Sequence, residues 1–162
     1  MKGKPQKTAA PRRGGSRALE SALRLLTRRD HTRRELVIKL RQRGFGAASV
    51  EEALARCSDL GYLDDARTAV TMAGHLVNRG YGCLRVRQML AQKGLDEAYI
   101  EKALHCCGDE KTQLHRARHV LEKRRLRLQR EADPWKRRQA AYRFLAGRGY
   151  PADVIHRVIE DI

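Results

Sequence analysis

The segment LRQRGF at residues 40–45 recurs as LAQKGL at 90–95 and as LAGRGY at 145–150, and this recurrence indicates how the chain folds. Each copy has a leucine, a basic residue and a glycine at the same spacing. A β-branched residue follows ten positions after the leucine and an aliphatic residue fourteen after it. These later pairs are Val50 and Leu54, Ile100 and Leu104, and Ile155 and Ile159. Three matches at one spacing indicate an internal repeat of one structural unit.

Helix capping explains how this spacing turns the chain. A basic side chain is favoured in the last turn of a helix, and a glycine after it adopts the left-handed conformation that ends the helix. We therefore expect a corner between two helices at each of Gly44, Gly94 and Gly149. Ser49 with Glu52 fits a capping box for the helix after the first corner.

Another helical stretch lies upstream of each corner. The apolar spacing predicts these upstream helices at 18–29, 65–79 and 112–130. Thr32 with Glu35 forms a second capping-box pattern, at the start of the helix that leads to the first corner. Each unit therefore contains one upstream helix and the two helices that meet at the corner.

The helical units define the expected domain organisation. The sequence predicts an all-α chain of three tandem three-helix repeats at residues 18–62, 63–109 and 110–162. Units of this size share limited interfaces, which favours an elongated, curved array over a sphere. Residues 1–17 are rich in Lys, Arg, Gly and Pro, with hardly any large apolar side chain. We expect them to be a disordered basic tail.

The net charge of +16 is concentrated in two segments. Residues 1–17 hold six basic residues and no acidic one, and residues 111–148 hold thirteen basic residues against three acidic ones. The rest of the chain is formally neutral. Charges of one sign repel each other unless an anion is near, so this distribution favours a polyanionic or acidic partner over a merely solvated helix face.

The basic surface is expected on the last third of the chain. Leu114, Ala117, Leu121 and Leu128 can share one face of the helix predicted at 112–130, which leaves the basic residues around the rest. The residues expected to contact DNA or a protein partner are Arg116, Arg118, Lys123, Arg124, Arg125, Arg127, Arg130, Lys136, Arg137 and Arg138. For Trp135, a core or docking role is favoured over base stacking, because one aromatic residue is no stacking platform.

Enzymatic signatures are missing from the sequence. It has no phosphate-cradling glycine-rich loop and no His-Glu-x-x-His motif. For Asp64 and Asp65, a helix cap is favoured over a cation site, since no further ligands follow at loop spacing. For His115 and His119, which follow the pair Cys106-Cys107, ordinary histidines are favoured over zinc ligands. We therefore expect a protein without catalytic residues, metal or cofactor.

The cysteines and the hydropathy indicate the cellular compartment. The four cysteines form no disulfide pattern, and the sequence has no apolar signal stretch and no run of eighteen apolar residues. We expect a cytoplasmic protein with reduced thiols, no membrane partner and a monomeric state.

A second pattern overlaps the repeats. It consists of Gly61, Tyr62, Leu63, Asp64 and Asp65, followed by Arg79, Gly82, Arg85, Lys93 and Gly94. This pattern resembles the central signature of the bacterial RecX regulatory proteins, and residues 144–155 are similar to the closing segment of that family. The resemblance spans about residues 18–162.

The resemblance implies a function. Proteins of the RecX family bind the RecA recombinase, lie along the groove of its filament on DNA, also bind DNA, and usually inhibit ATP hydrolysis and strand exchange. It therefore implies a non-enzymatic regulator of DNA repair and the SOS response, with the RecA filament and single- and double-stranded DNA as partners. The alternative is a general nucleic-acid-binding helical protein without a recombinase partner.

Overall fold

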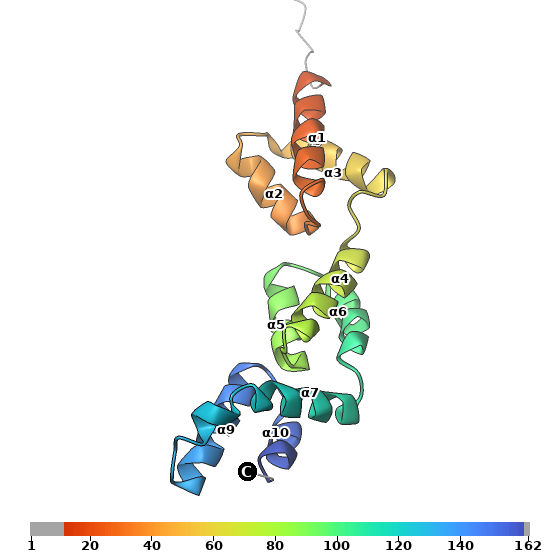
Figure 1. The fold of residues 1–162 in the computed structure, drawn as a ribbon. Helices are drawn as coiled ribbons and strands as arrows, with labels where there is room; N and C mark the ends of the chain where they lie inside the picture. The colour runs from red at the N-terminus through yellow and green to blue at the C-terminus, as the bar shows by residue number, and fades with distance from the viewer. Residues whose placement is uncertain (1–11, 161–162) are drawn as a thin grey trace, which may run out of the picture. The chain divides into compact units, whose positions relative to one another are not determined.

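The computed structural model describes residues 12–160, and every element of this part is helical. The elements are α1 (Arg12–Leu26), α2 (Arg33–Gln42), α3 (Ala47–Asp59), α4 (Asp65–Asn78), α5 (Cys83–Gln92), α6 (Glu97–Leu104), a 3-10 turn η1 (His105–Cys107), α7 (Glu110–Glu122), α8 (Arg125–Leu128), α9 (Pro134–Gly147) and α10 (Ala152–Ile159) (Figure 1). The all-α prediction is confirmed. None of these helices is both long and apolar enough to cross a membrane.

The three glycine corners adopt the predicted conformation. Gly44, Gly94 and Gly149 have φ angles of +85°, +74° and +82°. At the first corner, the amide of Gly44 donates to the carbonyl of Arg41 at 2.9 Å and the amide of Phe45 donates to that of Leu40 at 3.2 Å. This is the Schellman pattern of a helix end, and the other two corners repeat it.

The repeated apolar positions form the three cores. Leu40, Leu90 and Leu145 are fully buried, and the β-branched residues ten positions later are 1 % exposed in every copy. Each repeat has its own hydrophobic cluster. The repeat inferred from the sequence is therefore a repeat of core positions, in which the leucine before each corner packs against the helix after it.

The first unit extends to Asp65 and the second begins at Ala66. In the first unit, α1 packs against both α2 and α3. Leu63, expected to open the second repeat, is 6 % exposed and belongs to the core of the first. The carboxylate of Asp65 accepts a hydrogen bond from the Arg33 amide at 2.8 Å, at the start of α2. The two units therefore divide at 65/66, three residues after the predicted boundary at 62/63.

Two further predictions for the first unit are corrected. Helix α1 begins at Arg12, so residues 12–17 of the predicted tail are helical, because the helix continues upstream of its apolar stripe. Residues 1–11 lie outside the described part of the chain. Ser49 and Glu52 form no capping box, because α3 already starts after Gly46. The capping box of Thr32 and Glu35 is confirmed.

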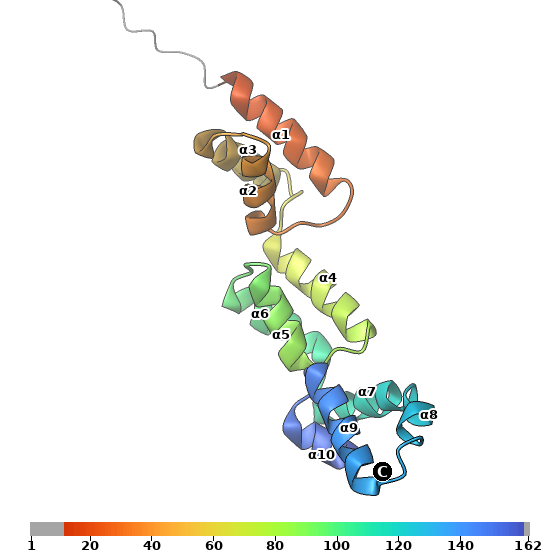
Figure 2. The same ribbon diagram turned by 90° about the vertical axis from the view of Figure 1, so that its left-hand side faces the viewer.

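The second unit contains the second and third repeats, and their backbones meet (Figure 2). The Gly82 amide donates to the Arg148 carbonyl at 2.8 Å, and the Leu84 amide donates to the Gly149 carbonyl at 3.1 Å. The Tyr150 hydroxyl donates to the Gly80 carbonyl at 3.4 Å. The start of α5 is therefore bonded directly to the corner between α9 and α10.

Candidate nucleic-acid interface

The predicted helix at 112–130 is broken in the structure. Helix α7 ends at Glu122, Lys123 and Arg124 form a turn, and α8 covers only Arg125–Leu128. Like charges three or four positions apart destabilise a helix, and the basic residues between 123 and 130 are spaced in this way. Leu128 therefore lies on α8, on a different helix from Leu114, although both pack against the same core.

Eight of the ten predicted basic contacts are exposed. They are Arg118, Lys123, Arg124, Arg125, Arg127, Arg130, Lys136 and Arg138. Arg125 forms an exposed ion pair with Glu122 at 3.2 Å. Within the described residues, no carboxylate forms an ion pair with Lys123, Arg127 or Arg130. We call this exposed set the basic face. Its members Lys123, Arg127 and Arg130 therefore keep their charge available to a partner.

Arg116 and Arg137 have internal partners instead. The Arg116 guanidinium donates to the carbonyl of Cys107 at 2.7 Å and to that of Cys106 at 3.2 Å. Arg137 donates through Nε to the carbonyl of Glu131 at 3.2 Å. Both side chains are half-buried. We assign these two arginines a role in holding the backbone before α7 and before α9.

Helix α9 has the predicted start. The Asp133 carboxylate accepts hydrogen bonds from the amides of Trp135 at 2.8 Å and Lys136 at 3.4 Å, and Pro134 is the first residue of the helix. Trp135 is 63 % exposed, so the core role considered for it is wrong. Leu126 is also exposed, at 80 %. Two large apolar side chains therefore lie at the surface of this cationic segment.

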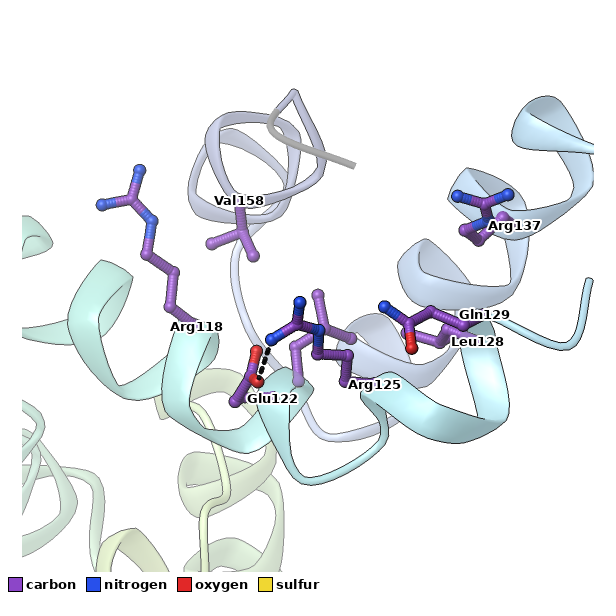
Figure 3. A pocket seen from close by; sticks show the side chains of 8 residues that line it. Arg118, Glu122, Arg125, Leu128, Gln129, Arg137 and Val158 are labelled. Carbon is purple, nitrogen blue, oxygen red and sulfur yellow. Dashed lines mark hydrogen bonds and ion pairs between the residues drawn. The ribbon is translucent and has the colours of Figure 1, made fainter.

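A pocket of about 440 Å³ lies inside the third repeat, lined by residues on both sides of the α7–α8 turn. Figure 3 shows Arg118 and Glu122 on α7, Arg125 and Leu128 on α8, and Val158 on α10 around it. The Glu122 carboxylate lies against the Arg125 guanidinium and neutralises part of its charge. This pocket is therefore mixed in charge, with an apolar wall from the third core.

A second hollow, of about 620 Å³, lies between the second and third repeats. Its cationic lining consists of Arg79, Arg116, Lys123, Arg124 and Arg148. The sequence predicts for Arg148 only the role of the basic residue that ends a helix, and it does not indicate the contact of Arg148 with the second repeat. The basic residue before each corner glycine was the available signal, but its spacing alone does not show what the side chain reaches.

The first five signature residues lie at the link between the two units. Gly61 adopts a left-handed φ of +72°, and Leu63 is buried in the first core. Asp65 accepts from the Arg33 amide, and Tyr62 is 56 % exposed. Asp64 is exposed just before α4. No group of three or more metal-ligating side chains occurs in the described residues.

The other signature residues surround the contact between the second and third repeats. The Arg79 carbonyl accepts from the Arg148 guanidinium at 2.9 Å, and Gly82 bonds to the Arg148 backbone. Arg85 packs its Cα and Cβ against Gly149, while Lys93 and Gly94 end α5. The structure therefore gives these signature residues roles in joining and ending helices.

The fold defines a class of small all-helical proteins built from tandem three-helix domains, with a cationic surface on the last domain. Family models of the first, second and third three-helix domains of RecX match residues 18–57, 64–104 and 111–159. The chain belongs to the RecX family of regulatory proteins.

Individual relatives agree with this assignment. The chain is 36 % identical over 148 residues to the regulatory protein RecX of Legionella pneumophila (strain Corby), covering 91 % of this chain and 95 % of the relative. It is 39 % identical over 141 residues to that of Pseudomonas putida (strain W619), covering 86 % of each. A crystal structure of RecX from Lactobacillus salivarius superposes with a TM-score of 0.80 at 22 % identity, over 92 % of this chain and 96 % of that one, and has the same fold.

Proposed function

We propose that this protein is a non-enzymatic regulator that binds the RecA nucleoprotein filament and inhibits its ATP hydrolysis and strand exchange, and thereby its role in DNA repair and the SOS response. Membership of the RecX family, a family of regulatory proteins, supports this proposal. The protein acts as a monomer in the bacterial cytoplasm. It contributes contacts and no chemistry.

One observation carries the proposed contact with the filament. The basic face presents Lys123, Arg127 and Arg130 without ion-pair partners among the described carboxylates. Cations of this kind gain binding energy by displacing the counterions that surround a nucleic acid. The basic face therefore contacts DNA phosphates or acidic recombinase surface. Contacts of the helical array with neighbouring recombinase subunits favour an inactive arrangement of the filament or block its groove to a second DNA.

The deciding experiment is a titration of the purified protein into a RecA-driven ATPase assay on single-stranded DNA. Filament binding predicts strong inhibition at doses well below those that saturate the DNA. A general nucleic-acid-binding protein would inhibit only when it covers the DNA lattice. Inhibition confined to DNA-saturating doses therefore overturns the proposal and supports the alternative.

A charge variant links the effect to the basic face. Arg127→Gln with Arg130→Gln removes two exposed charges that have no described ion-pair partner. We expect the dose for half-inhibition to rise several-fold while the thermal unfolding curve stays unchanged. Lys111→Gln with Arg143→Gln removes two exposed charges of the same repeat outside the basic face and serves as the charge-matched control.

A further inference from the structure

The cleft between the second and third repeats is cationic on both sides. Arg79 directly follows α4 in the second repeat, whereas Arg116, Lys123, Arg124 and Arg148 come from the third repeat. No Asp or Glu is among the described residues that line it. This lining differs from that of the pocket inside the third repeat, where Glu122 offsets part of the charge. The cleft is therefore a concave surface of one sign.

Two of the guanidinium groups are held in place by other contacts. Arg148 donates to the Arg79 carbonyl at 2.9 Å and to the Gly80 carbonyl at 3.3 Å. Its guanidinium carbon lies 5.1 Å from the centre of the Phe144 ring, and that of Arg124 lies 4.3 Å from the same ring. An aromatic face attracts such cations. The Phe144 ring therefore holds the positive charges of Arg124 and Arg148 near each other, and it neutralises neither of them.

The positively charged side chains that line the cleft repel one another, and a bound anion would reduce this repulsion. Within the described residues, no carboxylate forms an ion pair with Arg79, Lys123, Arg124 or Arg148. Like charges in a concave site raise its positive potential above that of a flat surface. Guanidinium groups present several donors at once, and such forks match the oxygens of phosphate. The Phe144 ring is already contacted by the two guanidinium groups, so the cleft offers phosphate contacts and no stacking surface for a base.

We propose that this cleft is a phosphate-binding site shared by the second and third repeats. Lys123 and Arg124 bind the phosphate from the third repeat, and Arg79 binds it from the second. Arg148 supplies a fixed positive charge between them. A phosphate bound in this way contacts both repeats at once, so binding also stabilises the junction between them.

The probe for this site is inorganic tripolyphosphate, titrated into the full chain and followed by calorimetry. We expect saturable binding of one tripolyphosphate per chain, with a rise in the unfolding temperature. Lys123→Gln with Arg124→Gln is expected to weaken binding about tenfold or more, since charge-assisted contacts are lost. Arg79→Gln, on the other repeat, is expected to weaken it about tenfold as well. Its backbone carbonyl, which accepts from Arg148, is unchanged by the substitution.

The charge-matched control is Lys111→Gln with Arg143→Gln. Both residues are exposed and neither lines the cleft. We expect this variant to bind tripolyphosphate within about twofold of the unaltered chain, because the charges that are lost do not line the cleft. Equal weakening in the control and in the cleft variants means diffuse attraction to the whole cationic surface and overturns the site. The proposed site is also overturned if tripolyphosphate binding never saturates. The same holds if Arg79→Gln binds tripolyphosphate as tightly as the unaltered chain.

A competition experiment identifies the source of the phosphate. A fifteen-nucleotide oligo(dT) that displaces tripolyphosphate assigns the site to the DNA backbone, and this assignment rests on the proposed function. An oligonucleotide that binds without displacing it assigns the site to free polyphosphates or nucleotides. The RecA-driven ATPase assay is scored separately. Saturable tripolyphosphate binding in a protein that leaves the ATPase unchanged rejects the proposed function and retains the site.

Discussion

Gly82 and Gly149 meet backbone against backbone, and neither position has room for a side chain. A Cβ atom on Gly82 would lie 2.3 Å from the Gly149 carbonyl oxygen, and one on Gly149 would lie 2.3 Å from the Arg85 backbone nitrogen. Gly149 also needs its left-handed φ of +82° to end α9. Gly149 therefore ends α9 and, because it has no side chain, also allows the second repeat to pack closely against it.

We expect Gly82→Ala to destabilise the protein by about 1–3 kcal/mol, because a methyl group there forces the two backbones apart. Urea unfolding followed by circular dichroism measures this. Gly46→Ala is the matched control, since Gly46 is also the N-cap of a helix but has no atom within 4 Å of its Cβ position. If both variants lose the same free energy of unfolding, the effect comes from the N-cap position and not from the close contact between Gly82 and Gly149.

Arg148 stabilises the same junction through its side chain. Arg148→Ala removes its hydrogen bonds to the carbonyls of Arg79 and Gly80, and we expect a loss of about 1–3 kcal/mol. The amide protons of Gly82 and Leu84 should then exchange faster with solvent, as measured by NMR. Arg143→Ala removes an exposed arginine of the same helix and should leave both exchange rates unchanged. If the exchange rates of these two amides are unchanged in Arg148→Ala, the Arg148 side chain does not stabilise the junction.

The first unit should lose stability in mild acid. His31 is 3 % exposed, and burial lowers its pKa below the usual 6.5, while Nδ1 lies 2.9 Å from the Arg29 carbonyl oxygen. Above about pH 6.5 the ring is neutral in both folded and unfolded states. Below that value the unfolded chain takes up the proton first, so unfolding becomes easier as the pH falls. Urea unfolding at pH 7.5 and pH 5.0 measures the effect.

His31→Gln is the test of this assignment. The variant lacks the titrating ring, so the difference in unfolding free energy between pH 7.5 and pH 5.0 should shrink. His105→Gln changes an exposed histidine and is expected to leave that difference as it is. A pH dependence that is identical in all three proteins would assign the acid sensitivity to other groups.

Cys107 should be unreactive in the folded protein. Burial raises the pKa of its thiol to about 12, and burial also raises the pKa of the Cys57 thiol. The thiolate is the reactive form, so both residues should resist iodoacetamide at pH 8 and react fully in denaturant. Mass spectrometry of tryptic peptides measures the extent of labelling. Rapid labelling of Cys107 in the native protein would contradict its burial.

The basic residues should divide into two groups. Arg127→Gln should leave stability unchanged and lower the salt dependence of DNA binding by about one unit of slope per phosphate contact. Arg137→Gln should instead cost about 1 kcal/mol of stability, because it loses its hydrogen bond to the Glu131 carbonyl. Unfolding curves and DNA titrations at several salt concentrations separate the two effects. Identical behaviour of the two variants would reject the division.

Much of the fold follows from local patterns in the sequence. The corners at Gly44, Gly94 and Gly149 are readable because a helix end depends on a few neighbouring residues and on one φ angle. The buried leucines before the corners are readable for a similar reason, since helical spacing places them on one face. The apolar spacing does not predict the break after Glu122, because it carries no information about repulsion within a run of basic residues.

The cationic segment was equally visible in the composition, but the roles of its members were not. Arg116 and Arg137 have the same charge as Arg127, yet their guanidinium groups donate to backbone carbonyls of the chain itself. The contact of Gly82 with Arg148 joins positions 66 residues apart. Helix ends and core positions depend on near neighbours, so the sequence was sufficient for them. The pairing of one repeat with the next depends on which backbones approach each other in space, and this approach is visible only in the folded protein.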